Sequence, residues 1–139
     1  MILYLDTSAL VKLYVDEEGS ERIRGLVESA QVIATSRVSY VEARAGVARK
    51  LREGDLTERE YRQILEDLEK DWKSYFIVEV SERVTRIGGE LVGRHPIRGF
   101  DAIHLASGIL LKNRTEEEVL FACFDERLKE AAKSEALLV

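Results

Sequence analysis

Short apolar runs alternate along this chain with longer segments in which apolar residues recur every three or four positions. The runs at 2–5, 31–35, 76–80 and 119–124 are too short for helices and are bounded by polar residues, so they predict buried strands. A last run at 137–139 predicts a short fifth strand. The segments between them predict helices that are long enough to connect parallel strands. The sequence therefore predicts an α/β fold with a five-stranded parallel sheet and helices on both faces.

The expected helices carry recognisable start and stop signals. Thr57 and Glu60 form a capping box, and helical spacing then continues to Trp72. Another helix is expected from Ser36 to about Glu53, because Gly54 is a typical helix terminator. The first helix, which follows the opening strand, is expected to be capped by Thr7 or Ser8, with Asp6 itself as the alternative N-cap.

Composition limits what this chain can be and do. Its 139 residues fit a single domain, 1–139, with 45% hydrophobic residues. No apolar segment approaches the roughly 20 residues of a membrane span, and the start lacks a signal-peptide pattern, so we expect a cytoplasmic protein. The formal net charge of -5 argues against broad non-specific nucleic-acid binding. The single cysteine, Cys123, lies in an apolar run and is interpreted as a core residue.

Four acidic residues occupy positions that a catalytic site could use. Asp6 and Asp125 each follow a predicted strand, at the edge where open α/β sheets place their sites. Glu42 lies beside the apolar stripe of its helix, and Asp101 lies in the first turn of another. Each also has an ordinary interpretation, since the aspartates suit helix N-caps and Glu42 suits a helix edge.

The predicted strand order, 3-2-1-4-5, places Asp6 and Asp125 together where the order reverses beside strand one. Glu42 and Asp101 come from helices that could lean over the same edge. Carboxylates without a histidine or thiol cluster favour a hard cation, so Mg²⁺ or Mn²⁺ is the expected guest. With only His95 and His104 available, a multi-histidine site is excluded. We expect His104 to hydrogen-bond Asp101 or to pack as an interior residue.

At this point the sequence resembles a known family. The segments 5–11 (LDTSALV), 41–44 (VEAR), 98–106 (RGFDAIHLA) and 124–128 (FDERL) are similar to the four acidic motifs of PIN domains. The resemblance is closest to VapC-type toxin ribonucleases and covers essentially the whole chain. The sequence departs from the pattern at Cys123, where many relatives have Thr or Ser.

The resemblance implies hydrolysis of RNA phosphodiester bonds with one or two Mg²⁺ or Mn²⁺ ions. By resemblance, Asp6 and Asp101 are direct ligands, Asp125 is a direct or water-mediated ligand, and Glu42 is a ligand or the base that takes the proton of water. Ser8 would orient Asp6. Three arginines could contact RNA phosphate or could be ordinary surface residues: Arg98, Arg44 and Arg94.

The resemblance also implies a homodimer and a small VapB-like antitoxin whose tail covers the acidic pocket. Two helix faces are candidate contact surfaces, with core packing as the alternative: Ile23, Leu26 and Val27 on one, and Tyr61, Leu65 and Trp72 on the other.

Other functions remain open or fit poorly. A catalytically silent PIN-like module that binds RNA or protein is possible, as is a solitary RNA-processing nuclease. A phosphoacceptor receiver domain needs an aspartate after strand three, where this chain has Val80 and Ser81. A haloacid-dehalogenase-like phosphatase needs an aspartate where this chain has Ser8.

Overall fold

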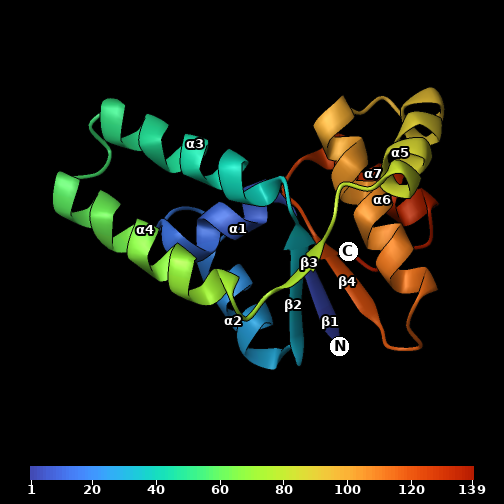
Figure 1. The fold of residues 1–139 in the computed structure, drawn as a ribbon, viewed down its shortest axis with the longest axis horizontal. Coiled ribbons are helices and arrows are strands. Elements are labelled where there is room, and N and C mark those ends of the chain that lie inside the picture. The colour runs from blue at the N-terminus through green and yellow to red at the C-terminus, as the bar shows by residue number, and fades with distance from the viewer.

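A four-stranded parallel sheet lies at the centre of the computed structural model, which describes residues 1–139 (Figure 1). The strands are β1 (Ile2–Leu5), β2 (Val32–Ser36), β3 (Phe76–Val78) and β4 (Val119–Ala122). Their order is β3-β2-β1-β4, with every neighbouring pair parallel. The α/β class and the order of these four strands are as the sequence predicts, and β1 has β2 on one side and β4 on the other.

The predicted fifth strand at 137–139 is wrong. Only Leu138 reaches the sheet, through a single parallel bridge to Leu120 in which the Phe121 N–H donates to the Leu138 carbonyl at 2.8 Å. The chain turns at Ala136, whose φ is +63°, and Leu137 is buried in the core. The last residues therefore contact β4, on the side where the fifth strand was predicted, but they do not form a strand that pairs with it.

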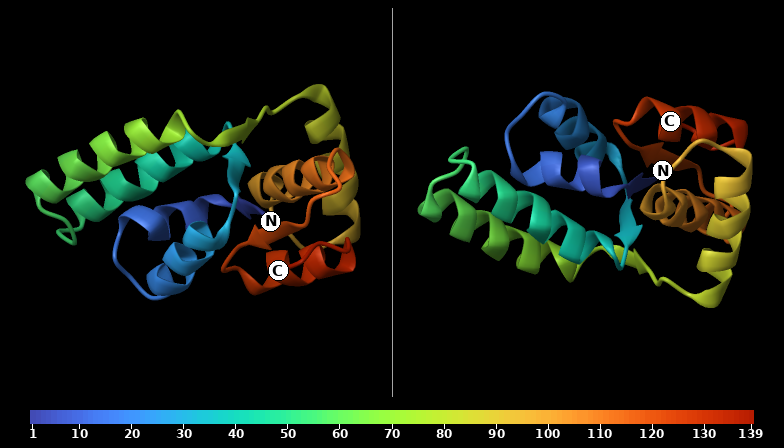
Figure 2. Two further views of the ribbon diagram at one scale, coloured as in Figure 1. Left: turned by 90° about the horizontal axis from the view of Figure 1, so that it is seen from below. Right: turned by 90° about the horizontal axis from the view of Figure 1, so that it is seen from above.

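The seven helices lie in two layers, one on each face of the sheet (Figure 2). One layer contains α1 (Thr7–Tyr14), α2 (Ser20–Ser29), α3 (Ser39–Arg52) and α4 (Glu58–Trp72), and the other contains α5 (Glu82–Arg94), α6 (Gly99–Asn113) and α7 (Glu126–Ser134). None of these helices combines the length and the apolar composition that crossing a membrane requires. The predicted arrangement, with helices on both faces, is present.

Side chains at the helix starts explain where several helices begin. The capping box of α4 forms as predicted, because Thr57 Oγ1 accepts from the Glu60 N–H at 3.1 Å and Glu60 accepts in return from the Thr57 N–H at 2.9 Å. Helix α1 differs from the expectation. Asp6 is its N-cap, in place of Thr7 or Ser8, and Asp125 caps α7 in the same way.

Two apolar cores hold the helix layers to the sheet. Alternate residues of β1 enter different cores, since Leu3 and Leu5 face the α1–α4 layer and Tyr4 faces the α5–α7 layer. The Tyr4 ring is fully buried and stacks on Phe121 at a centroid distance of 5.2 Å. Strand β1 therefore has no solvent-facing side, which suits its central place in the sheet.

The predicted contact surfaces on α2 and α4 belong largely to the core. Ile23 is completely buried, and Tyr61 and Trp72 are partly buried against the α1–α4 core. The large apolar side chains that remain exposed lie mostly elsewhere, with Val41 at 63% and Phe100 at 56% exposed. Both faces therefore take part in core packing, and their role as contact surfaces stays a prediction.

Glycine at position 108 allows α6 to approach β4 closely. A Cβ added there would lie 2.9 Å from Cδ2 of the buried Phe121, whereas one added at Gly25 on α2 would meet nothing within 4 Å. We predict that Gly108→Ala destabilises the fold by about 1–3 kcal/mol through overpacking. Gly25→Ala is expected to stabilise it by up to about 1 kcal/mol through helix propensity. Urea unfolding of the two variants measures both effects, and equal stability of the pair would contradict the close packing at Gly108.

Candidate active site

Asp6 directly follows β1, the strand that lies between β2 and β4 in the sheet, at the carboxyl end of that strand (Figure 1). Its backbone N–H donates to the Ala122 carbonyl at 3.1 Å, which places it beside the end of β4. The residue is 5% exposed. Its Oδ1 accepts hydrogen bonds from the Ala9 N–H at 2.9 Å and from Ser8 Oγ at 2.8 Å. Ser8 is the residue predicted to orient Asp6. Its Oδ2 accepts no hydrogen bond from the protein and is not sealed from solvent.

The environment of Asp6 disfavours its negative charge. Burial raises the pKa of this carboxyl, and the negative charge of Asp101 raises it further. The Ala9 amide, His104 and Ser8 act in the opposite direction without cancelling the rise. A buried carboxylate near a second carboxylate is stabilised by a cation, so the site has an electrostatic reason to bind one.

Glu42 reaches the same edge from the first turn of α3. Its Oε1 accepts a hydrogen bond from Thr7 Oγ1 and lies 3.0 Å from His104 Nε2. Partial burial raises the pKa of Glu42, but the hydrogen bonds from His104 and Thr7 outweigh burial, and the net effect lowers it. Its other oxygen, Oε2, has no hydrogen-bond partner in the protein. Glu42 is therefore an ionised carboxylate that is fixed through one oxygen.

Asp101 and Asp125 line one open pocket of about 440 Å³. Asp125 caps α7, with Oδ1 accepting from the Leu128 N–H at 2.9 Å. Asp101 lies in the first turn of α6, where Oδ2 is 3.7 Å from Nε of Arg98 and accepts no hydrogen bond. The other residues of the pocket are Pro96, Ile97, Arg98, Glu126 and Arg127.

Cys123 directly follows β4 and is buried. Burial raises the pKa of its thiol to about 12, with contributions from the negative charges of Asp6, Asp125 and Asp101. Such a thiol stays protonated at neutral pH, which agrees with the interpretation of Cys123 as a core residue and argues against a nucleophilic role.

The donor set fits a hard cation. No three of the histidine, cysteine, aspartate and glutamate side chains are grouped closely enough to hold a metal ion as they stand. Asp6, Glu42 and Asp125 are nevertheless each fixed through one oxygen and retain a second with no protein partner. Oxygen ligands of this kind are those that Mg²⁺ and Mn²⁺ prefer.

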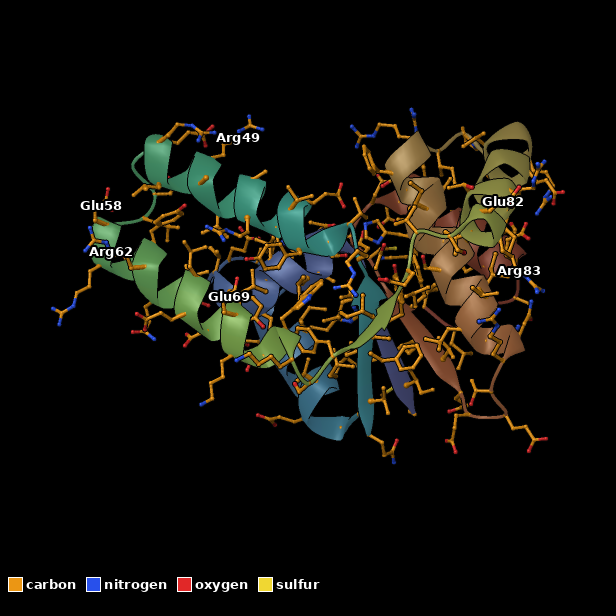
Figure 3. All side chains as sticks on the ribbon, viewed as in Figure 1. Arg49, Glu58, Arg62, Glu69, Glu82 and Arg83 are labelled. Carbon is orange, nitrogen blue, oxygen red and sulfur yellow. The ribbon has the colours of Figure 1, made fainter.

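Only one of the three predicted arginines lies at the acidic edge. Arg98 lines the pocket of Asp101 and is 87% exposed. Arg44 Nη1 instead donates a hydrogen bond to the Tyr40 hydroxyl at 2.9 Å. The same nitrogen lies 4.0 Å from Oε1 of Glu69, which Figure 3 labels on α4. Arg94 pairs with Glu135 at 2.9 Å. Arg44 and Arg94 thus have acidic neighbours in the protein, and their contact to RNA phosphate stays a prediction.

Sequence reasoning missed two residues of the site and misplaced the contact of one. Arg127 lines the pocket with Arg98, and its position two residues after Asp125 was the available signal. Thr7 was considered only as a cap, yet its hydroxyl contacts Glu42. His104 is interior, as expected, but its polar partners are Tyr4, Thr7 and Glu42 in place of Asp101.

A four-stranded parallel sheet with four carboxylates at its carboxyl edge is the arrangement that the acidic motifs of PIN domains imply. Residues 3–134 match the PIN domain family, and the chain belongs to that family.

Several known proteins are similar to this chain in sequence or in fold. Ribonuclease VapC45 of Mycobacterium tuberculosis is 36% identical over 135 residues, covering 94% of this chain and 89% of the relative. Among solved structures, FitAcB from Neisseria gonorrhoeae superposes with a TM-score of 0.71 at 21% identity, covering 100% of this chain and 96% of the other. A toxin-antitoxin complex from Klebsiella pneumoniae gives a TM-score of 0.63 at 18% identity, covering 85% and 83%. The structural matches bear on the fold alone.

The raised pKa of Asp6 predicts how stability responds to its charge and to metal. Asp6→Asn keeps an N-cap and removes a buried negative charge, so the metal-free variant is expected to melt about 2–4 °C above wild type, or roughly 1 kcal/mol. Mn²⁺ at ten times its Kd is expected to stabilise wild type by about 1.4 kcal/mol and the variant far less. Thermal melts with and without Mn²⁺ measure both changes.

The matched control is Asp55→Asn, which neutralises an exposed aspartate outside the site. It is expected to leave the Mn²⁺ response unchanged. A full Mn²⁺ response in Asp6→Asn would contradict the assignment of Asp6 as a ligand.

Proposed function

We propose that this chain is a VapC-type endoribonuclease that hydrolyses RNA phosphodiester bonds with Mg²⁺ or Mn²⁺, and that it is the toxin of a toxin-antitoxin pair. Its membership of the PIN family and its 36% identity to Ribonuclease VapC45 support the ribonuclease activity. The observation that carries the proposal is the set of carboxylates near the ends of β1 and β4, of which three, Asp6, Glu42 and Asp125, are each fixed through one oxygen with the other left over.

The proposed metal ligands are Asp6 and Asp101, with Asp125 bound directly or through water. A bound Mg²⁺ or Mn²⁺ supplies a water of lowered pKa and positive charge beside the phosphate. Asp6 is suited to this role because its ionised form is costly without a cation, and Ser8 holds it in place through Oδ1. Loss of the Asp6 or the Asp101 carboxylate would remove a negative charge and a ligand from the proposed metal site.

Glu42 is the proposed ligand or general base. Hydrogen bonds from His104 and Thr7 hold its pKa low, so it is ionised at neutral pH and able to accept a proton through its free oxygen, Oε2. Arg98, joined by Arg127, is the proposed contact to RNA phosphate at the mouth of the pocket. Arg98 is only weakly paired with Asp101, at 3.7 Å, which leaves its guanidinium available for an anion.

The proposed partners are an antitoxin and a second copy of the chain. One of the solved structures with this fold is described as a toxin-antitoxin complex, which supports a small VapB-like antitoxin here. A homodimer remains a prediction, and the exposed apolar side chains Val41, Val92 and Phe100 give it surface to use. A cytoplasmic location would place the enzyme with its RNA substrate.

Cleavage of labelled single-stranded and structured RNAs tests the activity. Wild type is expected to cut with Mg²⁺ or Mn²⁺ and not with chelator. Asp6→Asn and Asp101→Asn are each expected to lose more than the ~10–100-fold that removal of a ligand-orienting residue costs, while Asp55→Asn cuts like wild type.

Two outcomes would count against the proposal. Cutting that persists in chelator and in Asp6→Asn would point to a contaminating nuclease. If folded protein binds Mn²⁺ and cuts none of the RNAs, the silent RNA- or protein-binding module becomes the better account of the fold.

The position of Arg98 gives a prediction about RNA affinity. Arg98→Ala is expected to weaken RNA binding about tenfold, on the order of 1.4 kcal/mol, because one charged contact to phosphate is lost. The salt dependence of binding should fall by about 0.7 in log–log slope for single-stranded RNA. Arg22→Ala, which removes an exposed arginine from α2, is the matched control. Equal losses in the two variants would mean that Arg98 acts only through net charge.

A further inference from the structure

A buried string of polar side chains runs from the core to Glu42. The Tyr4 hydroxyl lies 2.9 Å from His104 Nδ1, and His104 Nε2 lies 3.0 Å from Glu42 Oε1 and 3.1 Å from Thr7 Oγ1. Thr7 also donates to Glu42 Oε1. The string joins a fully buried strand residue to the proposed catalytic edge, and of its four members only Glu42 is one of the four acids.

The partners of the imidazole determine which ring nitrogen carries the proton. An ionised carboxylate can only accept hydrogen bonds, so the His104 nitrogen that faces Glu42 must be the donor. Nε2 therefore carries the proton, shared between Glu42 Oε1 and Thr7 Oγ1. In the neutral ring Nδ1 is then an acceptor, and the Tyr4 hydroxyl donates to it.

Burial holds this arrangement in place. Tyr4 is 0% and His104 2% exposed. The Tyr4 ring is stacked on Phe121 with an interplanar angle of 4°, and the imidazole packs edge-on against Tyr4 at 6.1 Å between centroids. The orientation of the imidazole is thus set by the core of the α5–α7 layer and not by solvent.

We propose that His104 is a positioning residue: its Nε2–H, together with the Thr7 hydroxyl, holds Glu42 through Oε1 in one orientation and leaves Oε2 for the metal ion or the attacking water. Tyr4 fixes the imidazole by donating to Nδ1. The inference rests on the proposed function, because it assigns His104 to the same site. This role differs from that of an ordinary buried histidine, because it requires an N–H donor at Nε2 as well as a packed ring.

Two substitutions separate the two ring nitrogens. The amide nitrogen of Gln occupies roughly the place of His Nε2, whereas that of Asn occupies the place of Nδ1. His104→Gln is expected to keep the donor to Glu42 and to cut RNA within a few-fold of wild type. His104→Asn should lose ~10–100-fold in kcat, as is usual when a residue that orients a ligand is removed, with the KM for RNA within about twofold.

Two readouts make the comparison independent of turnover. Mn²⁺ affinity, measured by titration calorimetry without RNA, is expected to fall about tenfold in His104→Asn and little in His104→Gln. Thermal melts of both variants report stability, and variants of equal Tm that differ in kcat and Mn²⁺ affinity support positioning. If His104→Asn of native-like Tm matches wild type in kcat and Mn²⁺ affinity, the proposal is overturned.

The proton on the imidazole can be observed directly by ¹H–¹⁵N NMR. The chain has two histidines, so a spectrum of His95→Gln assigns both. A proton on Nε2 of His104 is expected, and a proton on Nδ1 alone would overturn the proposal even if both substitutions abolish activity. If wild type does not cut RNA, the proposed function fails on its own, while the NMR and Mn²⁺ results still decide the role of His104.

Discussion

The parallel pairing of β1 with β4 is the constraint on which the rest of this structure depends. It joins strands that are more than a hundred positions apart in the chain, in a register that runs from Ile2 opposite Val119 to Leu5 opposite Ala122. The next hydrogen bond, from the Asp6 N–H to the Ala122 carbonyl, sets the first acid beside the end of β4. A register shifted by one residue would turn Tyr4 away from Phe121 and move Asp6 out of the acidic edge.

Local folding and chemistry use different atoms of the same carboxylates. Asp6 and Asp125 are helix N-caps through Oδ1, and Glu42 is held by His104 and Thr7 through Oε1. The ordinary interpretation of an aspartate as a cap therefore does not compete with the catalytic one, because a carboxylate has two oxygens and a cap needs only one. This division also helps the fold to tolerate negative charge at one edge, since three of the four acids accept hydrogen bonds before any cation binds.

The sequence predicted the features that depend on local patterns. Periodicity gave the helices and the four strands, and the acidic motifs gave the candidate residues, because both are encoded by neighbours in the chain. It could not identify the partner of His104, since Glu42 lies 62 positions away and only the tertiary fold brings them together. The fifth strand was overpredicted because an apolar run cannot reveal the turn at Ala136 that precedes it. The ion pairs of Arg44 and Arg94 could not be predicted either, because their partners also come close only in the tertiary fold.

The order of the acids along the chain has a consequence for synthesis in the cell. Asp6 is translated more than a hundred residues before β4 and Asp125, and β1 gains its second neighbour only once β4 has been made. Nascent chains, and fragments that stop before residue 119, hold the early acids without the strand that gathers them. Under the proposed function, cleavage of RNA would therefore begin only after β4 has been synthesised and has paired with β1.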